Sequence, residues 1–228
     1  MTNPRGYVIH EDSERVAILT MTSTNRKTGD MAQLWVLVRG QSPISAVQTG
    51  ADSAVCGDCR HRGAMGIRTC YVNVARAPSA VWNAWKRGLY PTLAPAEFPQ
   101  ALVSRKVRLG AYGDVAFLPL QTVQALSDAA SGHTGYTHQW ETSAGLKSLV
   151  MASVDTEIEA QRALKLGWRT FRVSRDTARL TGEIACPASA ESGHRTTCHD
   201  CRLCDGAKDR DKRKSVLIQV HGAAAKRF

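Results

Sequence analysis

Long hydrophobic runs are missing from this sequence: no stretch of about 18 apolar residues, the length needed to cross a membrane, occurs in its 228 residues. No membrane partner is therefore expected. Residues 1–14 are polar and charged, without the apolar segment of a secretion signal. We therefore expect a cytoplasmic protein, where cysteines more often bind metals or react as thiols than form disulfides.

Internal repeats, low-complexity tracts, phosphate-binding glycine-rich loops and nucleophile elbows are also missing. What is present is globular: 43% of the residues are hydrophobic and 22% are charged. The net charge of +10 attracts polyanions, so nucleic acid is a possible partner. The positive residues are spread along the chain, with small clusters at Arg105–Arg108 and Lys208–Lys214, so a solvated surface explains them equally well.

Apolar runs and glycine breakers predict strands and helices that alternate along most of the chain. Gln33–Gly40, for example, is a short apolar run ended by glycine, which is typical of a buried strand. The other expected strands are Arg15–Thr22, Val107–Ala111, Thr134–Trp140, the end of Leu146–Ser153, Trp168–Ser174, Glu183–Cys186 and Ser215–His221. The expected helices are Ser79–Arg87 with Ser79 as N-cap, Leu120–Ala130, Thr156–Leu166 and Arg175–Leu180.

Strands separated by helices of about ten residues indicate parallel βα units. Roughly six such units predict an α/β fold, a partial or short (β/α) barrel with cysteine-rich metal-binding loops; a doubly wound sheet is the alternative. We expect residues 1–30 to be an N-terminal lead-in and residues 31–185 to be the barrel-like domain. Residues 186–228 would form a C-terminal metal segment with a final strand.

Polar residues follow the expected strands, where barrel enzymes carry their functional groups. His138 could act as a base or a metal ligand, although a histidine at a strand end is often only hydrogen-bonded. Asp155 could be catalytic or could cap the helix that follows it. The residues at these strand ends are Asp114, His138, Asp155, Arg172 or Ser174, Cys186 and His221.

The first cysteine cluster is Cys56-x2-Cys59-x10-Cys70, in the loop after the first strong strand. Three thiolates leave one coordination position open. An iron–sulfur cube held by three cysteines would have one iron free to bind a small molecule. A zinc ion would want a fourth ligand, and His61 is near in sequence.

The second cluster holds four thiols: Cys186, and the closely spaced Cys198-x2-Cys201-x2-Cys204. Four thiolates make a closed site that suits zinc or a [4Fe–4S] cluster. The tight spacing favours iron–sulfur, because zinc ribbons more often use two separated pairs. Together the two clusters use all seven cysteines of the chain.

A strand, a three-cysteine loop and a second strand ending in Gly-x-x-Gly-Asp resemble the radical S-adenosylmethionine enzymes. The resemblance implies a [4Fe–4S] cube on Cys56, Cys59 and Cys70 whose free iron chelates S-adenosylmethionine. It also implies that Gly110, Gly113 and Asp114 contact the methionine amino group. The four-cysteine set resembles the auxiliary-cluster segments of many members.

Two departures from the family pattern stand out. The usual loop is C-x3-C-x2-C, whereas this chain has C-x2-C-x10-C, and Asp114 stands where the family has glutamate. The chain is also similar to uncharacterised bacteriophage proteins that share the CGDC and C-x2-C-x2-C features, which implies a host cytoplasm but no activity. The leading hypothesis is an iron–sulfur enzyme acting on nucleic acid or a nucleotide, with Asp114 and His138 at its catalytic site. The alternative is a non-catalytic, zinc-stapled, basic protein that binds nucleic acid or a host component.

Overall fold

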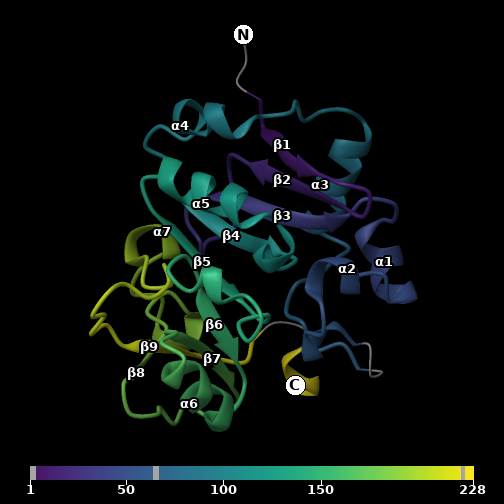
Figure 1. The fold of residues 1–228 in the computed structure, drawn as a ribbon. Helices are drawn as coiled ribbons and strands as arrows, with labels where there is room; N and C mark the ends of the chain where they lie inside the picture. Colours follow the sequence, from purple (N-terminus) through teal and green to yellow (C-terminus); the bar gives the residue numbers. More distant parts are fainter. Residues whose placement is uncertain (1–3, 64–66, 222–223) are drawn as a thin grey trace.

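The computed structural model describes residues 4–63, 67–221 and 224–228. Within these residues the chain forms one sheet of nine strands in the order β1-β2-β3-β4-β5-β6-β7-β9-β8 (Figure 1). The strands are β1 Gly6–Glu11, β2 Arg15–Thr20, β3 Ala32–Val38, β4 Val107–Tyr112, β5 His133–Thr137, β6 Met151–Val154, β7 Thr170–Ser174, β8 Glu183–Ala185 and β9 Ser215–Gln219. The helices are α1 Pro43–Thr49, α2 Ser53–Cys56, α3 Ala77–Lys86, α4 Phe98–Ala101, α5 Leu120–Ala129, α6 Glu157–Lys165 and α7 Cys198–Cys201.

The pairing of the strands confirms a mixed α/β fold. The strand order differs from that of a doubly wound sheet. β1, β2 and β3 pair antiparallel, and every later pair is parallel. From β1 to β7 the strand order follows the chain, whereas a doubly wound sheet reverses its order at a switch point. The sheet ends at β1 and β8 without closing, so the predicted barrel is an open one in the described residues.

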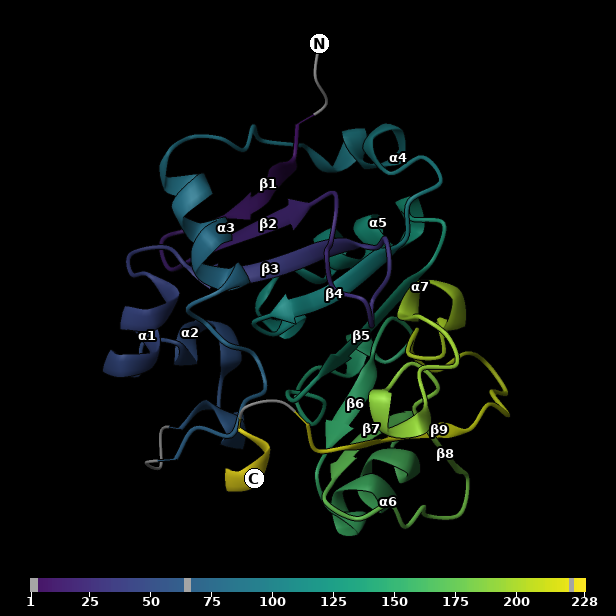
Figure 2. The ribbon, with the colours of Figure 1, turned by 180° about the vertical axis from the view of Figure 1, so that it is seen from behind.

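Two strands of the parallel part of the sheet, β3 and β6, are buried along nearly their whole length. β3 is buried at six of its seven positions and β6 at all four, as expected for strands covered on both faces. Figure 2 shows the sheet from behind, with α3 beside β1–β3 and α6 beside β7. Within the expected lead-in, Gly6–Glu11 and Arg15–Thr20 form a hairpin that extends the sheet beyond β3.

Two local expectations are also wrong. No helix forms between Ser174 and Glu183, where one was expected over Arg175–Leu180. α3 begins at Ala77, and the Ser79 hydroxyl bonds to the Val74 carbonyl instead of capping the helix. No helix in the described residues is long and apolar enough to span a membrane.

Candidate metal centres and the cavity between them

The three-cysteine loop leaves the carboxyl end of β3 and is held by its own polar contacts. The Arg62 guanidinium donates to the carbonyls of Gly50 and Gly57 at 2.8 and 2.7 Å and to the Asp52 carboxylate at 2.7 Å. The Cys70 N–H donates to the His61 carbonyl at 3.0 Å, which folds the two ends of the loop together. The loop is therefore built around buried hydrogen bonds rather than around an apolar core.

The Gly-x-x-Gly-Asp motif at the end of β4 lies against this loop. The Asp114 N–H donates to the Val55 carbonyl at 2.7 Å, one residue before Cys56. Gly113 has φ +74°, and a Cβ there would lie 2.3 Å from the Val36 carbonyl oxygen, so only glycine fits. A small cavity of about 80 Å³ lies between the motif and the loop. Its lining includes Cys56, Cys59, Cys70, Gly110, Gly113, Asp114, Arg62, Arg68, Tyr112 and His138.

The three thiols of the loop line this one cavity. Burial and the neighbouring Cys70 thiol raise the pKa of Cys59 to about 12, and burial also raises the pKa of Cys56. A metal cation would stabilise such buried thiols as thiolates. Tyr112 Oη, Arg62 Nε and Arg68 Nε, all from residues of this cavity, are buried without a hydrogen-bond partner among the described residues. The residues that would hold a cluster in this cavity are Cys56, Cys59 and Cys70.

The four-cysteine segment forms a second group, between β8 and β9. Cys198 and Cys204 pack in one apolar cluster with the buried Cys186, and burial raises the pKa of the Cys204 thiol. Backbone hydrogen bonds, including two made by cysteines, attach the segment to the rest of the protein. The Cys198 N–H donates to the Lys27 carbonyl at 2.8 Å, and the Gly135 N–H of β5 donates to the Cys204 carbonyl at 2.8 Å. All seven cysteines are free thiols.

Holding a metal ion requires more than nearby thiols, because the ligand side chains must also converge on one point. Among the described residues, no group of three or more histidine, cysteine, aspartate or glutamate side chains is arranged to hold a metal ion. The proposed zinc ligand His61 is engaged elsewhere. Its Nδ1 lies 2.8 Å from the Thr69 hydroxyl and its Nε2 lies 3.1 Å from the Asp155 carboxylate. Asp155 is therefore a partner of His61, and the N-cap of α6 is Thr156, which was missed.

The two predicted catalytic residues are adjacent. Asp114 accepts hydrogen bonds from the N–H groups of Ala116 at 3.0 Å and His138 at 2.8 Å. Nε2 of His138 lies 3.1 Å from the Ser153 hydroxyl, and burial lowers the pKa of the imidazole, which favours its neutral form. His138 therefore lies between the small cavity and a larger one.

The larger cavity, of about 470 Å³, extends from the three-cysteine loop across β4–β9. At one end it meets Cys59 and Cys70, and at the other the loop after Cys186. The Phe228 ring stacks on His61, with centroids 5.1 Å apart, and the Arg175 guanidinium donates to the Phe228 carbonyl. His221, predicted at a strand end, lines the same cavity, whereas Arg172 points away and forms a buried ion pair with Glu183 at 2.8 Å.

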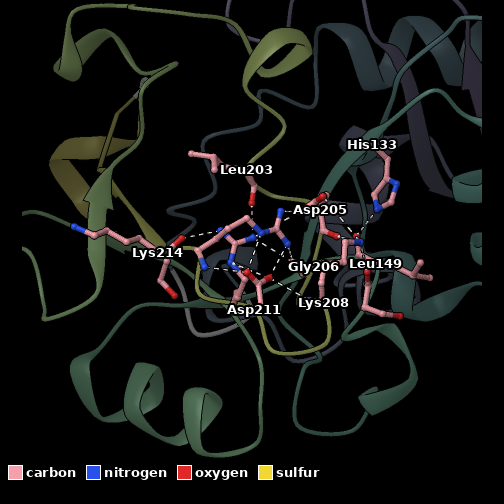
Figure 3. Close-up of polar contacts among 12 residues, drawn as sticks. His133, Leu149, Leu203, Asp205, Gly206, Lys208, Asp211 and Lys214 are labelled. Carbon is pink, nitrogen blue, oxygen red and sulfur yellow. Dashed lines mark hydrogen bonds and ion pairs between the residues drawn. The ribbon is translucent and has the colours of Figure 1, made fainter.

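One buried arginine that the sequence did not single out fastens the four-cysteine segment to the sheet. Arg169, just before β7, donates to the carbonyls of Leu203, Gly206 and Lys214 at 2.6, 3.2 and 2.7 Å. Figure 3 shows these partners together with Asp205 and Asp211, which add negative charge around the guanidinium. A lone arginine before a strand carries no periodic signal, so only the fold reveals its role.

We expect Arg169→Met to lower the free energy of unfolding by about 3–5 kcal/mol, because it removes the donor from three carbonyls at a largely buried site. Urea unfolding measures the change. Arg210→Met is the matched control, since Arg210 is 93% exposed and should change stability by less than about 0.5 kcal/mol. Equal stability of the two variants would contradict the fastening role.

Comparison with known proteins finds no match: no family model, no curated protein and no solved structure is significantly similar to this chain. The class that the fold and the site define is therefore an open, mostly parallel α/β sheet with a cavity lined by two cysteines of the three-cysteine loop.

Proposed function

We propose that the protein is an iron–sulfur enzyme of radical S-adenosylmethionine type. One observation carries the proposal: the three-cysteine loop after the first parallel strand packs against the Gly-x-x-Gly-Asp turn after the second. The Asp114-to-Val55 hydrogen bond joins the two directly. The resemblance noted in the sequence requires this contact, although the cysteine spacing differs from the usual one.

The chain's residues have distinct roles in this proposal. Cys56, Cys59 and Cys70 would hold a [4Fe–4S] cube, which supplies the electron that cleaves the sulfonium of S-adenosylmethionine. Gly110 and Gly113, both at positive φ, turn the backbone toward the cysteine loop. Asp114 is a positioning residue because its carboxylate fixes the backbone of Ala116 and His138.

His138 is the side chain best placed to accept or hold a proton near the open iron. It lines both cavities and is neutral because burial lowers its pKa. The four-cysteine group would hold a second cluster, structural or electron-relaying. Its burial behind Cys186 and Ala188, 6% and 1% exposed, suits either role.

Binding of S-adenosylmethionine tests the proposal. Anaerobically reconstituted, reduced protein is expected to change its electron paramagnetic resonance spectrum when S-adenosylmethionine is added, because the ligand occupies an open iron. Asp114→Asn should retain the clusters and weaken binding by roughly tenfold through loss of the His138 backbone contact. An unchanged spectrum of iron-loaded parent protein would reject the radical-type function.

A further inference from the structure

Arg108 is a buried cation in the middle of the described structure with no anionic partner. Its side chain belongs to β4, and the residue is 8% exposed. Among the described residues no carboxylate lies within ion-pair distance of it, and the residues left undescribed contain no aspartate or glutamate. Burial of an unpaired charge is costly, so such a group is typical of a site where a ligand supplies the counter-charge.

The contacts of Arg108 leave two of its nitrogens free for a ligand. Nη2 donates to the hydroxyls of Tyr71, at 2.8 Å, and Tyr136. Nε and Nη1 have no partner among the described residues, and neither is enclosed by protein atoms. Arg108 lines the 470 Å³ cavity, so a ligand in this cavity can reach its side chain. Either free nitrogen can donate a charge-assisted hydrogen bond to an oxygen of a phosphate group.

The surroundings of Arg108 are positively charged on both sides. In the 470 Å³ cavity, Arg26 and Lys27 accompany it, and Glu191 is the single acidic residue among the described lining residues. A second groove of about 510 Å³ shares Arg108 and Tyr71 with this cavity. Arg5 and Arg76 line that groove, and no described acidic residue does. The basic lining therefore extends over a longer distance than a single phosphate group would occupy.

We propose that Arg108 binds a phosphate group of a nucleotide ligand, free or at the end of a nucleic-acid strand, in the cavity beside the cysteine loop. The cavity would hold the nucleoside, and the groove lined by Arg5 and Arg76 would hold further phosphates. The inference names the substrate class of the proposed function, but it rests on the cavity and not on the clusters. Phosphate binding can therefore be measured without S-adenosylmethionine, and either proposal can fail alone.

Two probes distinguish the sources of the phosphate: deoxycytidine monophosphate, and a six-nucleotide single-stranded DNA with a 5′ phosphate. Calorimetric titration of the purified protein at low salt is expected to detect binding of at least one. Arg108→Met should weaken that binding by ten- to a hundredfold, because a hydrogen-bonded charge is lost from a buried site. Arg108→Lys, which keeps the charge but not the fork, should lose less.

The matched control is Arg210→Met, which removes one exposed positive charge. Arg210→Met should bind both probes like the parent, and Arg108→Met should melt no lower than Arg108→Lys, since removing an unpaired buried charge does not weaken packing. Binding of deoxycytidine monophosphate supports a free nucleotide, and binding of the DNA alone supports a nucleic-acid end. The proposal would be overturned if neither probe binds. It would also be overturned if Arg108→Met and Arg210→Met lose equal affinity.

The nearest competing role is compensation of the charge of a metal-bound four-cysteine group, because Cys198 also lies near Arg108. Under that role Arg108→Met would lose metal and keep its phosphate affinity. That result would overturn the inference, and metal analysis of the same samples measures it.

Discussion

Cys56→Ala is expected to lose the iron of the three-cysteine group, about half of the roughly four to eight irons of brown, anaerobically purified parent protein. Only two thiolates, Cys59 and Cys70, would remain there, and a cube is not retained by two. S-adenosylmethionine binding should disappear completely, because the open iron goes with the cube. Iron and sulfide analysis, together with the visible spectrum, measure the loss.

His61→Ala is the matched variant, since it lies in the same loop and separates the metals. In the iron–sulfur model it keeps the cube, because His61 contacts Thr69 and Asp155 rather than the cysteines. In the zinc alternative it loses the metal. Colourless parent protein that contains zinc, with metal loss in His61→Ala, would contradict the iron–sulfur proposal and support the zinc-stapled binder.

Cys198→Ala is expected to have the largest effect on stability, because metal bound by the four-cysteine group contributes directly to folding. Removal of one of four ligands should release the metal and lower the free energy of unfolding by several kcal/mol. Without metal the segment is attached to the rest of the protein by hydrogen bonds, among them the backbone bonds of Cys198 and Cys204 and those of the Arg169 side chain. Thermal unfolding and metal analysis measure both effects.

The control for this variant is Cys59→Ala, which removes a thiol from the other group. It should lower the melting temperature less than Cys198→Ala does, since the Arg62 hydrogen bonds hold the three-cysteine loop without metal. An unchanged metal content and melting temperature in Cys198→Ala would contradict the assignment of a four-thiolate site.

The parts of the fold that could be predicted are those with local signals. Gln33–Gly40 was recognisable as a strand because an apolar run ends at glycine, and β3 occupies Ala32–Val38. Thr156–Leu166 was recognisable as a helix that Gly167 ends, and α6 occupies Glu157–Lys165. The two cysteine groups were predictable for the same reason: their spacing is short-range information.

The remainder depends on contacts between distant segments. Arg108 looks like one member of a basic cluster, and only the fold places it in a cavity between Tyr71 and Tyr136. The absence of a helix over Arg175–Leu180 has a similar cause: the Leu180 N–H donates to Glu183, and the Ala178 carbonyl accepts from Arg172. Tertiary partners outweigh helix propensity there.

The position of β9 between β7 and β8 bears on how the chain folds during its synthesis. β1 to β7 add to the sheet in the order in which they leave the ribosome. β8 cannot join them when it emerges, because its one neighbour, β9, is made 30 residues later, at Ser215. The four-cysteine segment links the two strands, so it stays an open loop until the last strand inserts. Metal bound by this segment would shorten the time that β9 needs to insert between β7 and β8. The time at which metal is delivered would then affect the yield of folded protein.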